Sequence, residues 1–213
     1  IEFIGHVFLS PGDEMIMADR AFAIFRLVGL MFQAKIVSVP MKDFTHDLPA
    51  MLNAITPRTK VVFIANPNNP TGTRVRSEEF YEFMDRVPRH VVIAMDEAYI
   101  ELLPAAEQPD VFRYVREGRR IIVLRTFSKT FGLAGMRLGY AVASAEGVEL
   151  MQRVRQPFNV SAMALAAGRG PVVVNEYADN PGGGTPGDGT YLLRAILDAK
   201  PAPGTCCFAS IND

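Results

Sequence analysis

The sequence has little cysteine, no tryptophan and no excess of charge of either sign. Its 213 residues include two adjacent cysteines, and 22 basic side chains stand against 23 acidic ones. A disulfide framework and a multi-cysteine zinc site are therefore excluded, and the electrostatic basis for nucleic-acid binding is missing. No apolar run approaches the roughly 18 residues that cross a membrane. We expect a protein of reducing, cytoplasmic surroundings that binds neither nucleic acid nor membrane.

Glycine is unevenly distributed along the chain. Seven of the 17 glycines lie between Gly168 and Thr190, in a stretch that also contains several prolines. Such a composition buries little apolar surface and is typical of loops or disorder. Because Ile1 already stands in an amphipathic helical pattern, we expect the chain to be a fragment.

Short apolar segments alternate with helical patterns over most of the sequence. Six segments have the length of buried strands: residues 14–18, 35–39, 61–65, 91–95, 121–124 and 138–142. Helical patterns lie between them, at residues 22–33, 48–55 and 77–87, with Asp47 and Ser77 as expected caps. This alternation predicts an α/β fold, a mostly parallel sheet with helices on both faces. The link before the last segment has little room for a crossover helix, so we expect that strand to be antiparallel.

Ligands of such sheets bind beyond the carboxyl ends of the strands, and polar residues follow three of the predicted strands. Residues 66–72 (NPNNPTG) predict either an ordinary tight turn or a rigid one that aims an asparagine amide. Asp96 ends a buried strand, where a carboxylate is costly unless a cation or donor meets it. It fits a magnesium ligand, a partner of a protonated ring nitrogen or a helix cap. The magnesium interpretation is disfavoured because no G-x-x-x-x-G-K-[ST] loop is present.

Lys129 is one of five lysines and stands among apolar and hydroxyl residues in a glycine-containing loop. An ordinary lysine has a pKa near ~10.4 and is not nucleophilic at neutral pH. Partial burial beside another cation lowers that pKa and allows Schiff-base chemistry. Thr126, Ser128 and Arg137 supply the donors of a phosphate clamp. The alternative is a solvated loop lysine with an arginine on the next strand. One ligand would account for all these groups: a pyridine ring with a phenolic oxygen, an aldehyde and a phosphate.

Four motifs carry a resemblance to a known family: NPNNPTG, DEAYIE, RTFSKTFGLAGMRLGY and VRQPFNVS. Together they resemble the class I and II pyridoxal-phosphate-dependent aminotransferases of fold type I, and most closely the branch that acts on histidinol phosphate. The resemblance runs from Ile1 to about Ala167. It implies that residues 1–167 form the large, cofactor-binding domain without its first segment. Residues 168–213 would be an atypical Gly/Pro-rich tail, either disordered or the remnant of an incomplete small domain.

The resemblance also implies roles for individual residues. Lys129 would bind pyridoxal 5′-phosphate covalently and then move a proton between the substrate α-carbon and C4′ of the cofactor. Asp96 would pair with the ring nitrogen, and Asn69 and Tyr99 with the phenolic oxygen. The phosphate would be held by Thr126, Ser128 and Arg137. Phe22 aligns with an aromatic residue that stacks on the ring. Its surroundings depart from the family's common Pro-Thr-Tyr wording, so a core position in its own helix stays open.

The implied reaction transfers the amino group of L-histidinol phosphate to 2-oxoglutarate, giving imidazole acetol phosphate and L-glutamate in histidine biosynthesis. A homodimer is implied as well. Two related activities stay open, those of an aromatic amino-acid aminotransferase and of a threonine-phosphate decarboxylase-like enzyme. An inactive fragment without cofactor is a third alternative, based on the missing segments. The three histidines are scattered, so we predict no metal site and expect surface or turn positions for His6, His46 and His90.

Overall fold

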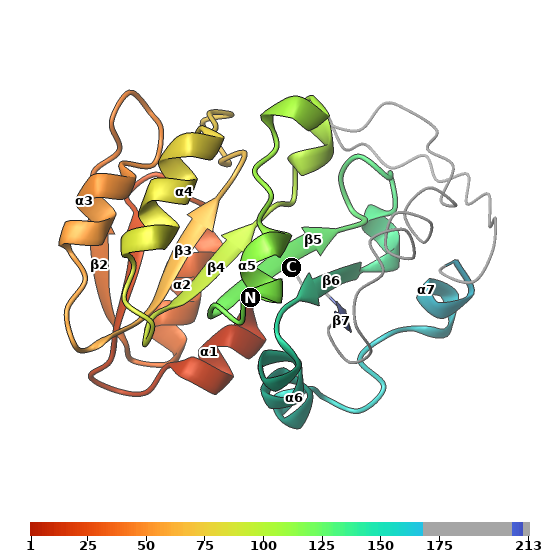
Figure 1. Ribbon diagram of the computed structural model, residues 1–213. Coiled ribbons are helices and arrows are strands. Elements are labelled where there is room, and N and C mark those ends of the chain that lie inside the picture. The colour runs from red at the N-terminus through yellow and green to blue at the C-terminus, as the bar shows by residue number, and fades with distance from the viewer. Residues whose placement is uncertain (168–205, 211–213) are drawn as a thin grey trace.

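The computed structural model describes residues 1–167 and 206–210, which contain one seven-stranded sheet and its covering helices (Figure 1). The strands are β1 (Glu14–Ala18), β2 (Lys35–Val39), β3 (Thr59–Ala65), β4 (Val92–Asp96), β5 (Ile121–Thr126), β6 (Leu138–Val142) and β7 (Cys206–Ser210). The α-helices are α1 (Glu2–Phe8), α2 (Ala23–Met31), α3 (Leu48–Asn53), α4 (Ser77–Arg86), α5 (Phe112–Arg116), α6 (Ala145–Val154) and α7 (Ala162–Ala167). Short 3₁₀ turns occupy Ile100–Leu102, Ala105–Glu107 and Ala134–Met136.

The order of strands across the sheet is β2-β1-β3-β4-β5-β6-β7. β1 to β5 are parallel, β6 is antiparallel to β5, and β7 is antiparallel to β6. The mostly parallel sheet and the antiparallel sixth strand confirm the sequence prediction. β7 was not predicted, and the glycine-rich residues 168–205 lie outside the described part of the chain.

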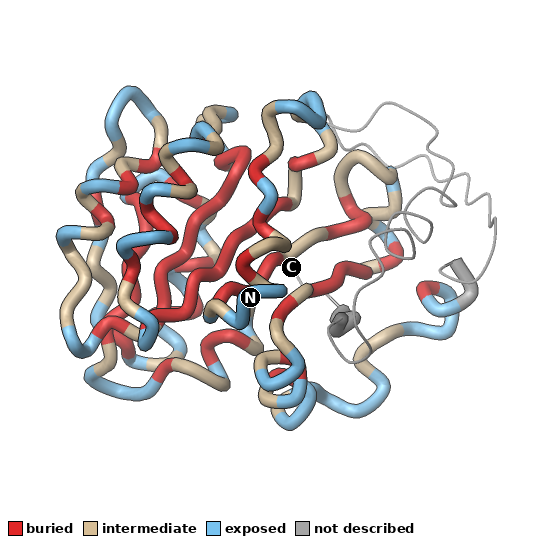
Figure 2. Tube along the Cα trace, viewed as in Figure 1, coloured by how far each residue is buried: buried red, intermediate tan, exposed pale blue. Residues whose placement is uncertain are grey.

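Helices cover both faces of the sheet because the central strands are apolar on both sides. One core joins α1, α2 and α6 to alternate strand residues such as Met15, Phe63 and Ala94. The second core joins α3, α4 and α5 to residues that point the other way, such as Ile64 and Ile93. Figure 2 shows the central strands buried along their length. The described helices include none long and apolar enough to span a membrane.

Helix ends follow local capping chemistry, with one correction. The Asp47 carboxylate accepts a hydrogen bond from the Ala50 amide at 2.9 Å, as predicted for the start of α3. The predicted cap at Ser77 is wrong, since Ser77 is already helical and Arg76 is the N-cap of α4. There Glu79 accepts hydrogen bonds from both the backbone and the guanidinium of Arg76, which replaces the expected hydroxyl.

Candidate active site

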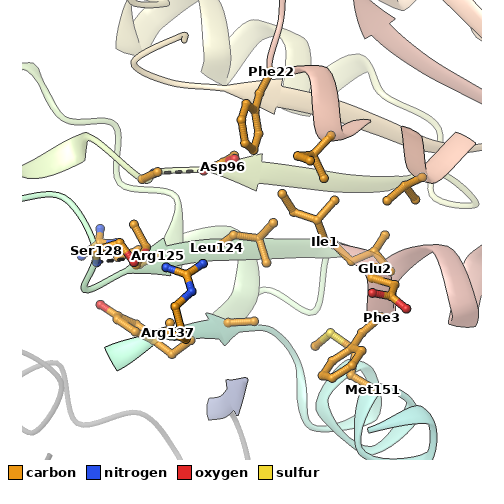
Figure 3. Close-up of a pocket in the computed structure, with 18 of the residues that line it drawn as sticks. Ile1, Glu2, Phe3, Phe22, Asp96, Leu124, Arg125, Ser128, Arg137 and Met151 are labelled. Atoms are coloured by element: carbon orange, nitrogen blue, oxygen red, sulfur yellow. Dashed lines mark hydrogen bonds between the residues drawn. The ribbon is translucent and has the colours of Figure 1, made fainter. Parts of the chain in front are cut away.

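The strand order reverses between β1 and β3, so their following loops diverge and leave a crevice at the carboxyl edge of the sheet. A cavity of about 670 Å³ opens near this edge and extends past β4, β5 and β6 (Figure 3). The structure brings every site residue predicted from the sequence to the wall of this cavity: Phe22, Asn69, Asp96, Tyr99, Thr126, Ser128, Lys129 and Arg137.

Asp96 is the last residue of β4 and lies almost completely buried. One carboxylate oxygen accepts a hydrogen bond from the Ala98 amide at 3.0 Å. Burial raises the pKa of the Asp96 carboxyl, and the Ala98 hydrogen bond and nearby positive charges, including Lys129, oppose that shift. A cationic group in the cavity would stabilise the ionised carboxylate, because it would replace lost hydration with a direct charge interaction.

Lys129 and Tyr99 come from different loops and meet at the wall of the cavity. The Lys129 Nζ atom lies 5.6 Å from the centroid of the Tyr99 ring, within the range of a cation–π contact. Tyr99 follows β4 and Lys129 follows β5, so adjacent parallel strands bring the amine and the phenol together. Both groups line the cavity, where an amine can meet an electrophile and a phenol can donate a hydrogen bond.

The turn between β5 and β6 gathers hydroxyl and guanidinium groups. Thr126 ends β5, and its Oγ1 accepts the Ser128 amide at 3.1 Å, so the Thr126 hydroxyl shapes the turn. The Ser128 Oγ is buried and has no hydrogen-bond partner among the described residues. Arg137 has φ 52° and ψ 48°, a left-handed conformation that is unusual for a non-glycine residue. It precedes β6 and reaches into the cavity (Figure 3).

Phe22 follows β1 and Asn69 follows β3, so the two residues lie on opposite sides of the switch point, the place where the strand order reverses. Phe22 is the N-cap of α2 and therefore lies just outside the helix that was expected to contain it. Its ring lies over Asp96 in Figure 3, and it also packs against the core through Phe25. Asn69 belongs to the turn after β3, in which both Asn-Pro bonds are cis. Aromatic, amide and carboxylate groups thus line the same cavity.

Sequence reasoning missed a buried ion pair beside the site. Glu97 is fully buried, and its Oε2 accepts a hydrogen bond from Arg125 Nε at 2.8 Å and lies 2.7 Å from Arg125 Nη2 in an ion pair. The other oxygen, Oε1, has no partner among the described residues. Burial raises the pKa of the Glu97 carboxyl to about 7, and Arg125 opposes the shift. The motif DEAY contained the acid, but only the parallel pairing of β4 with β5 identifies the arginine that meets it.

His46, which was expected at the surface or in a turn, is buried in the loop before α3. Its Nε2 accepts a hydrogen bond from the Ala65 amide at 3.3 Å, at the end of β3. Burial lowers the pKa of His46 to about 4. A neutral imidazole therefore supports the strand end from which the Asn69 turn begins. Groups of three or more possible metal ligands are absent from the described residues.

The chain matches known proteins over the same region that builds the cavity. It is 48% identical over 167 residues to histidinol-phosphate aminotransferase 1 of Dechloromonas aromatica, covering 78% of this chain and 46% of that protein. It is 40% identical over 178 residues to the Idiomarina loihiensis protein of the same name, covering 84% and 48%. The chain thus spans about half the length of the curated relatives it matches.

Solved structures give the same result for the fold. The crystal structure of histidinol-phosphate aminotransferase from Sinorhizobium meliloti in complex with pyridoxal-5′-phosphate superposes with a TM-score of 0.73 at 27% identity. The match covers 78% of this chain and 45% of that one. The family profile "Aminotransferase class I and II" matches residues 1–170. The motifs and the sheet of this chain, together with the profile match, show that it belongs to the class I and II aminotransferase family.

Proposed function

We propose that this chain carries the cofactor-binding part of a pyridoxal-phosphate-dependent transaminase. Its amino donor would be L-histidinol phosphate and its acceptor 2-oxoglutarate, with imidazole acetol phosphate and L-glutamate as products of a step in histidine biosynthesis. The observation that carries the proposal is the convergence of an amine, a buried carboxylate, a phenol, an amide and an arginine on one cavity. The names of the relatives from Dechloromonas aromatica and Idiomarina loihiensis support the choice of donor.

The residues of the cavity fit pyridoxal phosphate in charge and in hydrogen bonding. The Ser128 Oγ, which has no partner among the described residues, offers a donor for a phosphate oxygen, and Arg137 brings a positive charge to the same cavity. The buried Asp96 carboxylate offers the charge that a protonated ring nitrogen needs. Phe22 presents an apolar ring against which a flat heterocycle can stack. The site therefore provides a complementary partner for each polar end of the cofactor.

When bound, pyridoxal phosphate supplies an aldehyde that condenses with amines and a ring that withdraws electrons. The Lys129 amine would hold the cofactor through its aldehyde until the substrate amine displaces it. The freed Nζ would then take the proton from the substrate α-carbon and deliver it to the former aldehyde carbon, C4′. Asp96 would keep the ring nitrogen protonated, because its carboxylate lies in a low-dielectric site. Asn69 and Tyr99 would hydrogen-bond the phenolic oxygen, and Thr126, Ser128 and Arg137 would hold the phosphate.

Borohydride trapping tests the cofactor assignment directly. The chain is incubated with pyridoxal phosphate and reduced, and the modified peptide is identified by mass spectrometry. A pyridoxyl group on Lys129 is expected, because only this lysine lines the cavity among the described residues. Lys35→Ala and Lys60→Ala are matched controls that leave the adduct intact, and Lys129→Ala abolishes it. An adduct that survives in the Lys129 variant, or label spread over all lysines, would refute the assignment.

A donor comparison tests the substrate. Formation of L-glutamate from 2-oxoglutarate is measured with L-histidinol phosphate and, in parallel, with L-phenylalanine. A separate assay measures carbon dioxide release from threonine phosphate. Preference for L-histidinol phosphate supports the proposal, whereas faster turnover of L-phenylalanine or decarboxylation would assign the chain to one of the two related activities.

We also propose that residues 1–167 act as the cofactor-binding domain of a cytoplasmic homodimer. Three large apolar side chains of α2 are more than half exposed: Leu27, Leu30 and Met31. Leu27 and Met31 also line the cavity, whereas Leu30 does not, so these exposed apolar side chains continue from the rim of the cavity onto a surface that a second copy of the chain could cover. Sedimentation equilibrium of the parent chain and of a Leu30→Glu variant tests the dimer, and a monomeric parent would contradict it.

A further inference from the structure

A relay of hydrogen bonds joins the loops that follow β1, β2 and β3, and none of its members belongs to the predicted site. Asn68 is its centre and is 3% exposed. Its Nδ2 group donates one hydrogen bond to the carbonyl oxygen of Arg20 at 3.0 Å and another to Thr71 Oγ1 at 2.8 Å. Both N–H bonds of the amide are therefore used, and they point to different loops.

The direction of the relay follows from its last acceptor. Thr73 Oγ1 lies 2.6 Å from the Phe44 carbonyl oxygen, and a carbonyl can only accept. The single hydroxyl proton of Thr73 is therefore used there. In the 2.8 Å contact between the two threonine hydroxyls, Thr71 must then be the donor. All bonds run from Asn68 through Thr71 and Thr73 to Phe44, an arrangement in which each bond polarises the next.

The far end of the relay reaches a strained segment. Asp43 has φ 49° and Phe44 has φ 59°, so two successive non-glycine residues occupy the left-handed region. Such conformations cost energy and persist where surrounding contacts hold them. The Thr73 hydrogen bond to the Phe44 carbonyl is one such contact. The loop after β2 is therefore fixed to the loop after β3.

At its other end, the relay joins the loop after β1 to the loop after β3, through the hydrogen bond from Asn68 to the Arg20 carbonyl. Arg20 precedes Phe22 by two residues, and Asn69 directly follows Asn68. The bond from Asn68 to the Arg20 carbonyl thus fixes the separation of the two loops that carry the proposed ring-stacking aromatic and the proposed phenol-binding amide. A shift of either loop would change the width of the cavity where the ring would lie.

We infer that Asn68 is a positioning residue that sets the distance between Phe22 and Asn69 and so shapes the slot for a flat aromatic ring. The inference rests on the proposed function, because the slot is assigned to the ring of pyridoxal phosphate. Asn68 itself would act through its neighbours, since both of its N–H donors are already engaged within the protein.

Three variants of the chain test this role. Asn68→Ala removes both donors, Thr73→Val removes only the last bond of the relay, and Asn53→Ala changes an exposed asparagine on α3 as the matched control. Hydrogen–deuterium exchange of the protein without cofactor is followed in peptides that cover residues 19–25, 66–73 and 92–96. Affinity for pyridoxal phosphate is measured by its visible absorbance, and the pH midpoint of that absorbance is titrated.

In Asn68→Ala we expect exchange about tenfold faster in residues 19–25 and 66–73, with residues 92–96 unchanged. Cofactor affinity should fall about tenfold, and the pH midpoint should move, because Asn69 would no longer be held against the phenolic oxygen. A residue that only supports the fold would lower the unfolding temperature without moving that midpoint. Asn53→Ala should match the parent in every measurement.

The inference would be overturned if Asn68→Ala exchanged hydrogen in both loops at the rate of the parent. It would also be overturned if the variant kept the parent's affinity for pyridoxal phosphate and the parent's pH midpoint. If Asn68→Ala exchanges rapidly throughout and does not fold, Thr73→Val decides: faster exchange in residues 66–73 with a shifted midpoint supports the relay, and parental behaviour refutes it. A parent chain that takes up no pyridoxal phosphate would contradict the proposed function. The exchange comparison would then still decide whether Asn68 couples the two loops.

Discussion

Two buried glutamates lie at opposite ends of the parallel strands, and the protein surrounds them differently. Glu14 lies where the strands begin, which we call the amino edge of the sheet, and Glu97 lies where they end, which we call the carboxyl edge. Glu14 begins β1, where Lys35 and Arg58 each lie 3.0 Å from one carboxylate oxygen and Thr56 donates to the other. Hydrogen bonds from Thr56 and Lys35 lower the pKa of Glu14 to about 2. Glu97 follows β4; one of its oxygens is paired with Arg125, the other has no partner in the part of the chain that the structure describes, and burial raises its pKa to about 7.

The difference separates a buried carboxylate whose two oxygens are both bonded by the fold from one whose second oxygen has no partner among the described residues. At the amino edge, both carboxylate oxygens of Glu14 have partners within the protein, so its hydrogen-bonding capacity is met by the fold. At the carboxyl edge, Glu97 and Ser128 each keep a buried side-chain oxygen that has no hydrogen-bond partner among the described residues. Buried polar groups are costly when unsatisfied, so their accumulation along one edge indicates where stability is lower and binding is possible.

The largest expected effect is that of Asp96→Asn. Because the neutral amide cannot hold a proton on the ring nitrogen, amino transfer from L-histidinol phosphate should slow by about a hundredfold or more relative to the parent. The unfolding free energy without cofactor should stay equal or rise, since a buried carboxylate has been removed. Stopped-flow absorbance and urea unfolding measure the two quantities. A parental rate would contradict the role given to Asp96.

Glu97 offers the next largest effect, and it depends on pH. Its folded pKa of about 7 lies above the ordinary value of 4.5, so the folded state binds the proton more tightly than the unfolded state. The contribution of Glu97 to stability therefore falls as pH rises from about 4.5 to about 7, by something on the order of 3 kcal/mol. Glu97→Gln should remove this dependence. Urea unfolding of both proteins at pH 5 and pH 7.5 gives the difference.

A companion variant tests the ion pair itself. Glu97→Ala leaves the Arg125 guanidinium partly buried without its carboxylate, so we expect a loss of about 3 kcal/mol in unfolding free energy at pH 7. Glu149→Ala is the matched control, because it breaks an exposed pair with Arg153 and should cost less than about 1 kcal/mol. Equal losses in the two variants would show that Glu97 and Arg125 contribute no more than a surface pair.

At the amino edge, Glu14→Gln should lower stability without touching cofactor binding. The folded pKa of Glu14 lies below its ordinary value, so its contribution is present above about pH 4.5 and is lost as pH falls toward 2. The parent and the variant should therefore differ in unfolding temperature at pH 7 and converge at pH 2 to 3. Weaker pyridoxal-phosphate binding in Glu14→Gln would contradict the assignment of a purely structural role to Glu14.

These contrasts also show how far the sequence alone could lead. Strand ends were predictable because apolar runs stop where polar residues begin, and β1, β2 and β6 have the predicted bounds. The site residues followed from those strand ends and from motif resemblance. The partner of Glu97, the burial of His46 and the bond from Asn68 to Arg20 were not predictable. Each depends on which strands are neighbours, and local pattern does not encode strand order.

The smallest expected effect compares two hydroxyls, one from each edge. Ser128→Ala removes a buried hydroxyl without a described partner, so stability without cofactor should change by less than about 0.5 kcal/mol, whereas affinity for pyridoxal phosphate should fall about tenfold. Thr56→Val removes the donor to Glu14 and should cost about 1 kcal/mol of stability with unchanged affinity. Urea unfolding and absorbance titration measure the two quantities. If the two edges differ in role, Ser128→Ala loses affinity but not stability, and Thr56→Val loses stability but not affinity. If both variants lose stability and neither loses affinity, the free Ser128 hydroxyl is not a phosphate donor, and the turn after β5 is structural.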